Sequence, residues 1–250
     1  MKPVRLISRL DIKNSFLIKS INLEGLKKIG APNEFAIDYY KKGIDELVLI
    51  DCVASLYGRN NLTNIIKEIT KEIFIPVTVG GGIKTVTDVK DILKSGADKV
   101  AVNTAAVRRK KLIREISEEI GKQSLIISIQ AKKRHDKWEI FTESGKQSTG
   151  IDLVEWVSEV IELGAGEILL TSIDKEGTQS GFDIELIKAV SKICDIPLII
   201  SGGFGNLNHL DNLFTEEINI DGIAIAHALH YKKFKIEEIQ KKIENLKNKK

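Results

Sequence analysis

The sequence predicts an α/β protein that folds as a (β/α)8 barrel, and three observations support this fold class. The chain has 250 residues, of which 42% are hydrophobic and 29% charged, as in a globular protein with one large core. Short apolar segments alternate with helical patterns, which indicates a parallel sheet. The second half of the chain also resembles the first. We therefore expect one domain over residues 1–250, with half-barrels at about 1–121 and 122–250.

Eight short apolar segments have the character of strands, and eight strands with their helices are what a barrel of about 250 residues requires. In chain order they are Arg5–Asp11, Glu46–Asp51, Pro76–Gly80, Lys99–Asn103, Leu125–Gln130, Glu167–Ser172, Pro197–Ser201 and Gly222–Ala226.

Helices are predicted where apolar residues at helical spacing precede a glycine, which commonly ends a helix. Two such groups are Val89, Ile92 and Leu93 before Gly96, and Leu153, Val157, Val160 and Ile161 before Gly164. Residues 236–246 repeat isoleucine and leucine at the same spacing and predict a closing amphipathic helix. Residues 132–149 fit either a hairpin or a mobile flap, and the pattern does not choose between them.

The internal repeat has a nearly constant offset. Residues 44–51 match residues 165–172, and residues 75–82 match residues 196–203, in both cases 121 positions later. Residues 10–13 correspond to residues 129–132, so Gln130 stands where the first half has Asp11. The barrel is therefore predicted to consist of two similar halves.

Charge and cysteine content exclude several classes of partner. The chain has 38 Lys and Arg against 35 Asp and Glu, too even a balance to indicate nucleic-acid binding. No apolar run approaches the roughly 18 to 20 residues of a membrane span, and the N-terminus lacks a signal-peptide core. Cys52 and Cys194 show no metal-ligand spacing. We expect a cytoplasmic protein with reduced thiols, no metal and no cofactor.

The C-terminal ends of barrel strands are where active sites form, and two glycine clusters fall there. Gly80–Gly82 lies beside Asn103 and Thr104, and Gly202–Gly203 lies beside Ala226 and His227. Glycine lets the backbone approach a ligand closely, and exposed backbone N–H groups bind anions. We call these groups the first and second cradle. They predict a small molecule with a phosphate at each end.

Several segments resemble the HisF family, the cyclase subunits of imidazole glycerol phosphate synthase, and the resemblance covers nearly the whole chain. The segments are Leu10–Lys13, Val79–Ile83, Gly96–Val100, Asn103–Ala106, Phe141–Thr142, Ser144–Lys146, Gly164–Asp174, Gly177–Thr178, Ser180–Gly181 and Ser201–Gly203. The resemblance implies a barrel that forms a heterodimer with a HisH-like glutaminase docked at its bottom face. It further implies that the barrel receives ammonia from that partner and uses it on a substrate with two phosphates.

The resemblance also assigns roles to individual residues. The ammonia gate corresponds to Arg5, Glu46, Lys99 and Glu167, and the glutaminase interface includes Asp98. Strand alternation gives the four gate residues the same inward direction as Asp11, Ile50, Asn103 and Thr171. The phosphate-binding residues correspond to Lys19, Gly81, Gly82, Asn103, Thr104, Glu176, Gly177, Gly202, Gly203, Ala226 and His227.

Two departures from the family pattern affect catalysis. The family reaction resembles a two-carboxylate mechanism, and Asp11 supplies one carboxylate while Gln130 replaces the other. Glutamine exchanges no proton, so it is neither an acid nor a base, and such a loss costs on the order of 100 to 10,000-fold in rate. Arg9 replaces a small residue, usually cysteine, and shares the interior with Asp51, Thr78 and Thr171.

A buried arginine needs an ionic partner. Candidates for Arg9 are Asp11, Asp51 and Glu46; pairing with Asp11 would keep that carboxylate ionised.

Smaller departures lie around the mouth: Ser20 where the family has glycine, Glu176 where it has aspartate, and His227 where it has serine. His227 and His230 are spaced like a metal pair, but we expect His227 to line the mouth and His230 to cap the last helix.

Three functions remain open. The departures resemble a HisF paralogue group of acetamidino-modification proteins from surface-polysaccharide clusters, which work with a glutaminase and an N-acetyl sugar amidotransferase. In that interpretation the barrel conducts ammonia and its cyclase activity is lost. The alternative is an authentic cyclase of histidine biosynthesis, a lyase forming imidazole glycerol phosphate and aminoimidazole carboxamide ribotide. The third is the sister isomerase, which Gln130 and the inward charges disfavour.

Overall fold

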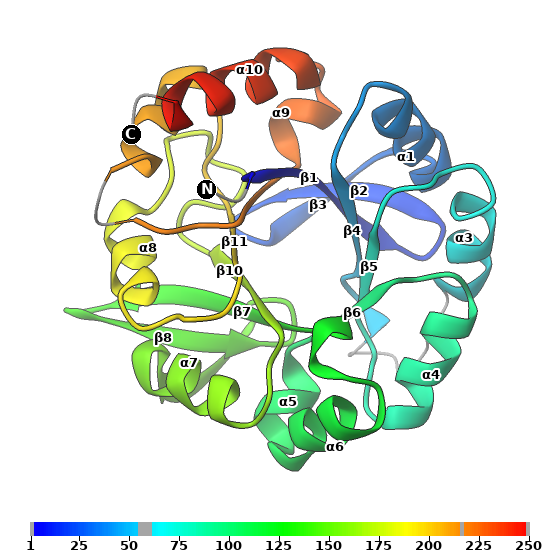
Figure 1. Cartoon of the computed structure of the whole chain (residues 1–250), viewed down its shortest axis with the longest axis vertical. Helices are drawn as coiled ribbons and strands as arrows, with labels where there is room; N and C mark the ends of the chain where they lie inside the picture. Colours follow the sequence, from blue (N-terminus) through cyan, green and yellow to red (C-terminus); the bar gives the residue numbers. More distant parts are fainter. Residues whose placement is uncertain (1–2, 55–61, 216–217, 249–250) are drawn as a thin grey trace.

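The computed structural model describes residues 3–54, 62–215 and 218–248. Its central feature is a closed barrel of parallel strands in the order β10-β11-β12-β1-β4-β5-β6-β7, which β10 closes by pairing with β7 (Figure 1). The strands are β1 (Arg5–Lys13), β4 (Glu46–Asp51), β5 (Val77–Gly80), β6 (Lys99–Val102), β7 (Leu125–Arg134), β10 (Glu167–Ser172), β11 (Leu198–Ser201) and β12 (Gly222–Ile225). The predicted (β/α)8 or TIM barrel is confirmed, whereas its division into two similar half-barrels stays a prediction.

The strand boundaries differ from the predicted ones for physical reasons. Pro76 and Pro197 precede β5 and β11, because proline has no N–H to donate to the ladder, although the carbonyl of each accepts a bond from a neighbouring strand. β6 and β12 end one residue before the predicted ends, Asn103 and Ala226. These two residues have ψ values of −86° and −72°, which lie outside the extended region.

Helices surround the barrel (Figure 1). They are α1 (Pro32–Lys41), α3 (Leu62–Ile69), α4 (Val86–Lys94), α5 (Thr104–Arg108), α6 (Lys111–Glu119), α7 (Leu153–Glu162), α8 (Ile184–Ser191), α9 (His227–His230) and α10 (Ile236–Lys247), with 3-10 turns at Lys122–Ser124 and Leu207–Leu213. Gly96 and Gly164 follow α4 and α7 at φ values of +111° and +102°, so the predicted glycine ends are confirmed. None of the helices in the described ranges is long and apolar enough to cross a membrane.

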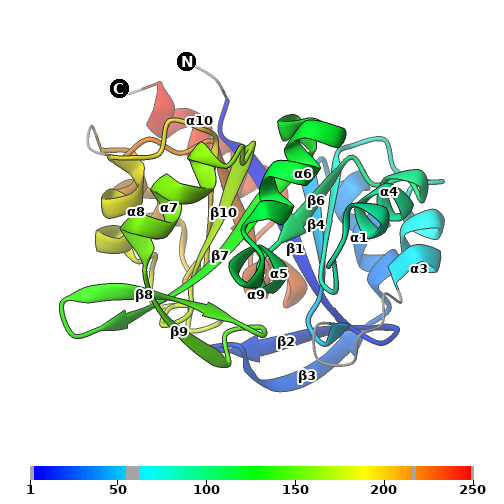
Figure 2. The ribbon, with the colours of Figure 1, turned by 90° about the horizontal axis from the view of Figure 1, so that it is seen from below.

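Two antiparallel hairpins extend from the mouth of the barrel, at the end opposite the chain termini (Figure 2). The first consists of β2 (Phe16–Ile21) and β3 (Glu24–Gly30) and continues β1. The second consists of β8 (Lys137–Thr142) and β9 (Gln147–Asp152) and continues β7, so residues 132–149 form a hairpin. The first hairpin is absent from the sequence-based prediction. Both hairpins extend the strands that carry Asp11 and Gln130.

The barrel has two separate cores because strand side chains alternate between its faces. Outward residues such as Leu6 and Leu47 pack against the helices. Inward residues form a second cluster, the inner apolar ring, which consists of Ile7, Val48, Ala101, Ile126, Leu169, Ile199 and Ala224. The ring shows which strand positions face the barrel axis.

The inner apolar ring is expected to contribute to the stability of the barrel. Leu169 is fully buried, so Leu169→Ala should lower the free energy of unfolding by about 2 to 5 kcal/mol. Val154 on α7 is 39% exposed, and Val154→Ala should change it by less than about 0.5 kcal/mol. Denaturant unfolding measures both variants, and an equal small effect would contradict this assignment of the core.

Candidate functional site

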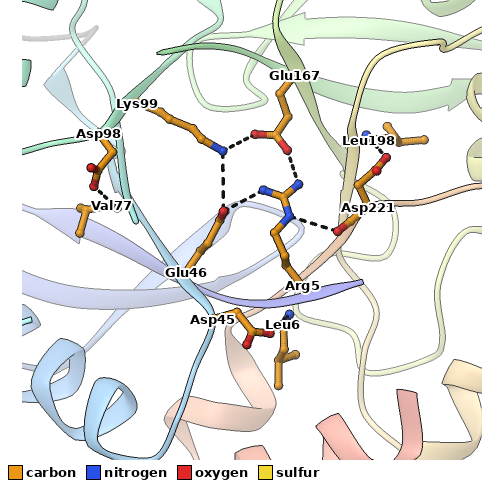
Figure 3. Close-up of polar contacts among 10 residues, drawn as sticks. All are labelled: Arg5, Leu6, Asp45, Glu46, Val77, Asp98, Lys99, Glu167, Leu198 and Asp221. Carbon is orange, nitrogen blue, oxygen red and sulfur yellow. Dashed lines mark hydrogen bonds and ion pairs between the residues drawn. The ribbon is translucent and has the colours of Figure 1, made fainter. Parts of the chain in front are cut away.

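Four charged side chains form a closed ring at the bottom of the barrel interior (Figure 3). Arg5 bonds Glu46 at 2.8 Å (Nη1 to Oε1) and also Glu167, while Lys99 lies 2.9 Å from Glu167 Oε2 and 3.7 Å from Glu46 Oε1. We call this set the bottom ring. Each member lies two positions before a residue of the inner apolar ring on the same strand, so all four share its inward direction.

Aspartates just before three strands hold the base of the barrel in place (Figure 3). Asp45, Asp98 and Asp221 each accept a backbone N–H from the adjacent strand, at 2.6, 2.8 and 3.0 Å respectively. Gly166 takes this place before β10, where a Cβ atom would lie 1.7 Å from the Lys122 carbonyl oxygen. Asp98, which is expected at a glutaminase interface, is exposed. It also anchors the start of β5 through the Val77 N–H.

The charges of the bottom ring compensate one another. The glutamate side chains are only 7% and 6% exposed, whereas the Arg5 and Lys99 side chains are 23% and 21% exposed at the solvent side. Oε2 of Glu46 is buried without a hydrogen-bond partner among the described residues. The ring therefore retains one unused acceptor at the boundary between solvent and the barrel interior.

Above the inner apolar ring, Arg9 forms an ion pair with Asp11. Arg9 Nε lies 2.9 Å from Asp11 Oδ1, and Nη1 donates to Thr171 Oγ1 at 3.0 Å. Of the three candidate partners, the structure selects Asp11; Asp51 instead accepts the N–H groups of Val53 and Ala54. Both members of the pair are 2% exposed, so neither charge is satisfied by solvent.

The protonation states follow from this pair. Burial acts to raise the pKa of Asp11, but the cations Arg9 and Lys19 outweigh it and hold that pKa below its ordinary value of 3.8. The carboxylates of Asp11 and Glu176 likewise raise the pKa of Arg9 despite burial. Asp11 is therefore ionised at neutral pH and is a weak base.

A second buried ion pair joins the first hairpin to the loop after β10. Lys19 contacts Glu176, each 3% exposed, and the Asn22 N–H donates to the Glu176 carbonyl at 2.7 Å. Lys19, Glu176, Arg9 and Asp11 together form the upper ion cluster, which contains two positive and two negative charges. The expected phosphate ligands Lys19 and Glu176 are thus bonded to each other.

Gln130 lies beside the Arg9 pair. In the ladder it is aligned with Thr171 of β10, the residue that holds Arg9. Gln130 is 6% exposed, and its Oε1 is buried without a partner among the described residues. It lines the cavity at the first cradle, so this amide is positioned to accept a hydrogen bond there.

The first cradle borders a cavity of about 250 Å³. Gly81 and Gly82 have φ values of +103° and +72°, and a Cβ on Gly81 would lie 2.3 Å from the Asp51 carbonyl oxygen. Only glycine fits this turn. Asn103 Nδ2 donates to the Phe141 carbonyl at 3.2 Å, and Thr104 Oγ1 accepts the Glu143 N–H at 3.1 Å. These two expected phosphate ligands thereby also hold the second hairpin.

The second cradle has the same kind of backbone. Gly202 and Gly203 have φ values of +102° and +100°, and the Gly203 carbonyl accepts the Gly181 N–H at 2.9 Å. A Cβ on Gly202 would lie 3.4 Å from Glu176 Oε2, which places that carboxylate at the cradle. Gly177 packs on the first hairpin, because its own Cβ would lie 2.3 Å from the Ser20 carbonyl.

The two histidines near β12 have different environments. His227 is half-buried, its Nδ1 lacks a partner in the described residues, and burial lowers its pKa. The expectation that His230 caps the last helix is wrong, because α10 begins at Ile236 with Lys235 before it. His230 is instead buried at the end of α9, and its Nδ1 bonds the Tyr39 hydroxyl at 2.7 Å. Burial lowers its pKa to about 4.

Within the described ranges, no group of three His, Cys, Asp or Glu residues has the arrangement of a metal site. Cys52 and Cys194 are both free thiols.

Comparison with known proteins assigns the chain to a family. A family model described as "Histidine biosynthesis protein" matches residues 5–235. Curated relatives from several organisms carry the name "Imidazole glycerol phosphate synthase subunit HisF". The Legionella pneumophila protein is 52% identical, and the match covers 84% of this chain and all of the relative. The Thermococcus onnurineus protein is 45% identical over 96% of this chain and 94% of the relative. The Streptococcus mutans protein is 42% identical over 96% of both chains.

Breaking the Arg9–Asp11 pair should be costly. Arg9→Met or Asp11→Asn should each lower the free energy of unfolding by about 3 to 5 kcal/mol, because a buried charge loses its partner. The double variant should lose much less than the sum of the two, as a double-mutant cycle measures. The exposed pair Lys42–Asp38 is the control, with a coupling of about 0 to 1 kcal/mol. Additive losses at Arg9 and Asp11 would contradict the pairing.

His230 should make stability depend on pH. Its pKa is about 4 in the folded chain against an ordinary 6.5, so between these values only the unfolded chain takes up the proton. Stability should therefore fall by about 3 kcal/mol as the pH drops from 6.5 to 4. His230→Gln should remove this part of the pH dependence of unfolding, whereas exposed His135→Asn should not. An unchanged profile in His230→Gln would disprove the assignment.

Proposed function

The chain belongs to the HisF family of histidine biosynthesis proteins, and from this premise we propose that it is the barrel subunit of an imidazole glycerol phosphate synthase-type complex. In this complex a HisH-like glutaminase binds the bottom face and supplies ammonia to the barrel. The mouth binds a substrate with two phosphates. The observation that carries the proposal is the coexistence in one barrel of an inward bottom ring and two left-handed glycine cradles.

Ammonia is proposed to enter through the bottom ring. The unused Oε2 of Glu46 accepts a hydrogen bond from ammonia at this boundary. Entry requires the ring to part, and Lys99 is the member whose contact with Glu46, at 3.7 Å, is longest. The inner apolar ring above it favours neutral ammonia over ammonium, since it has no polar group to replace the lost hydration of an ion.

The cyclase reaction of histidine biosynthesis is the activity that the names of the relatives favour. Asp11 and both cradles support it. The reaction as the family performs it needs an acid and a base on opposite sides of the mouth. Here Gln130 exchanges no proton, and the lowered pKa of Asp11 makes it a poor base.

A second candidate is favoured by this specific observation. Arg9 pairs with Asp11 and keeps its carboxylate ionised, and Gln130 replaces the other carboxylate. The barrel therefore fits an ammonia-conducting subunit whose own cyclase activity is lost. Ammonia would then pass on to an N-acetyl sugar amidotransferase for acetamidino modification of a surface-polysaccharide sugar.

A cyclase assay with ammonium salts separates the two candidates. The native chain should convert the phosphoribosyl formimino substrate about 100 to 10,000-fold more slowly than a HisF enzyme with aspartate in place of Gln130. Gln130→Asp alone should restore little activity, because Arg9 still holds Asp11. Arg9→Cys together with Gln130→Asp should restore substantially more.

The remaining outcomes are equally informative. A native rate equal to that of a HisF enzyme would rule out the second candidate and the inhibitory role of Arg9. No conversion by the double variant, provided that it folds and activates the glutaminase, would contradict the assignment of the lost activity to Arg9 and Gln130.

A further inference from the structure

A run of four cations follows the first cradle and is not explained by the proposed reaction. Residues 108–111 read Arg-Arg-Lys-Lys and run from the last residue of α5 to the first residue of α6. Arg108 and Arg109 line the cavity beside the cradle, and Lys84 lines it after Gly82 and Ile83. Among its described lining residues the one carboxylate is Asp51, which already accepts two backbone N–H groups. The cavity therefore carries more positive charge than one phosphate monoester requires.

The two arginines have N–H donors to offer to an anion. Arg109 bonds Glu115 at 2.6 Å, and because both side chains are exposed (47% and 41%), this pair contributes little and a ligand can displace it at small cost. Arg108 bonds the buried Glu143 at 2.7 Å through Nη2 and keeps this bond, while its 60% exposed guanidinium has further N–H donors. Each guanidinium has five N–H donors in a planar fork that matches the oxygens of a phosphate.

The inner end of the cavity independently indicates a ligand. Gln130 lies there with Oε1 buried and unpartnered in the described structure. Leaving a buried acceptor without a donor costs free energy, and Gln130 is more than nine-tenths buried. A ligand with an O–H or N–H donor at its inner end would satisfy this atom.

We propose that the cavity at the first cradle binds an organic diphosphate rather than a phosphate monoester. One phosphate lies on the backbone of Gly81 and Gly82, and the second is held by Arg108 and Arg109. The rest of the ligand extends inward and donates a hydrogen bond to Gln130. This inference rests on the phosphate-binding role of the first cradle in the proposed function and names the substrate class for it. Because the cyclase substrate carries one phosphate at each end, a diphosphate at this cradle agrees with the second candidate.

Calorimetric titration of the full-length chain with inorganic pyrophosphate and with inorganic phosphate tests the inference. Pyrophosphate should bind at least ~10-fold more tightly than phosphate, because charge-assisted bonds to arginine contribute at this level. Arg109→Gln should lose about 10-fold of the pyrophosphate affinity while the phosphate affinity stays nearly unchanged. Arg108→Gln is made together with Glu143→Gln, so that no buried carboxylate loses its partner, and should have the same effect.

Lys110→Gln is the matched control. It removes the same charge from the same run, but Lys110 contacts Glu159 and Trp156, away from the cavity. It should therefore leave pyrophosphate binding unchanged.

Three results would overturn the inference. If phosphate and pyrophosphate bind with equal affinity, the first cradle still binds phosphate, but the proposed preference for a diphosphate is disproved. Equal losses in Arg109→Gln and Lys110→Gln would reduce the effect to general surface charge. Binding of neither anion would instead disprove the cradle's phosphate role, and with it that part of the proposed function.

Discussion

The structure depends on the pairing of every charge that points into the barrel. Strand alternation directs Arg5, Arg9 and Asp11 of β1 inward together with Ile7, so Arg9 and Asp11 are removed from water and Arg5 is partly buried. Each has a partner: Arg5 has the glutamates of the bottom ring, and Arg9 and Asp11 have each other. An unpaired charge at Arg9 or Asp11, which are buried, would cost several kcal/mol. The interior is consequently built in layers, with the inner apolar ring between the bottom ring and the upper ion cluster.

This layering connects the fold to the chemistry. The bottom ring closes the interior toward solvent while leaving Glu46 Oε2 unused. At the mouth, Lys19 and Glu176 tie the first hairpin to the loop after β10, so the hairpin and the charge balance of the interior depend on each other. Arg9 adds a cation that the mouth must compensate, and the compensating group is Asp11. Arg9 thus links the stability of the barrel to the protonation state of Asp11.

Strong periodicity explains what the sequence could predict. The eight barrel strands are buried on both faces and give apolar runs. Their alternation predicts that the four residues of the bottom ring, which the HisF resemblance identifies, face inward, and limits the partners of Arg9 to three. The first hairpin was missed because β3 is mostly exposed and has no periodic apolar pattern. His230 was misassigned because its partner, Tyr39, lies 191 positions away. Arg108 and Arg109 likewise show no function until the fold places them on a cavity. Contacts between distant segments are not encoded in local spacing.

The central claim is that Arg9 keeps Asp11 ionised and unavailable as a base. The pKa of the Asp11 carboxyl, followed by NMR through its carbonyl carbon shift, tests this most directly in the native chain and in Arg9→Met. We expect a pKa below 3.8 in the native chain and a higher pKa in the variant, because the effect of burial is then no longer outweighed by Arg9. A native Asp11 that titrates above its ordinary value, or a pKa unchanged by the loss of Arg9, would contradict the account.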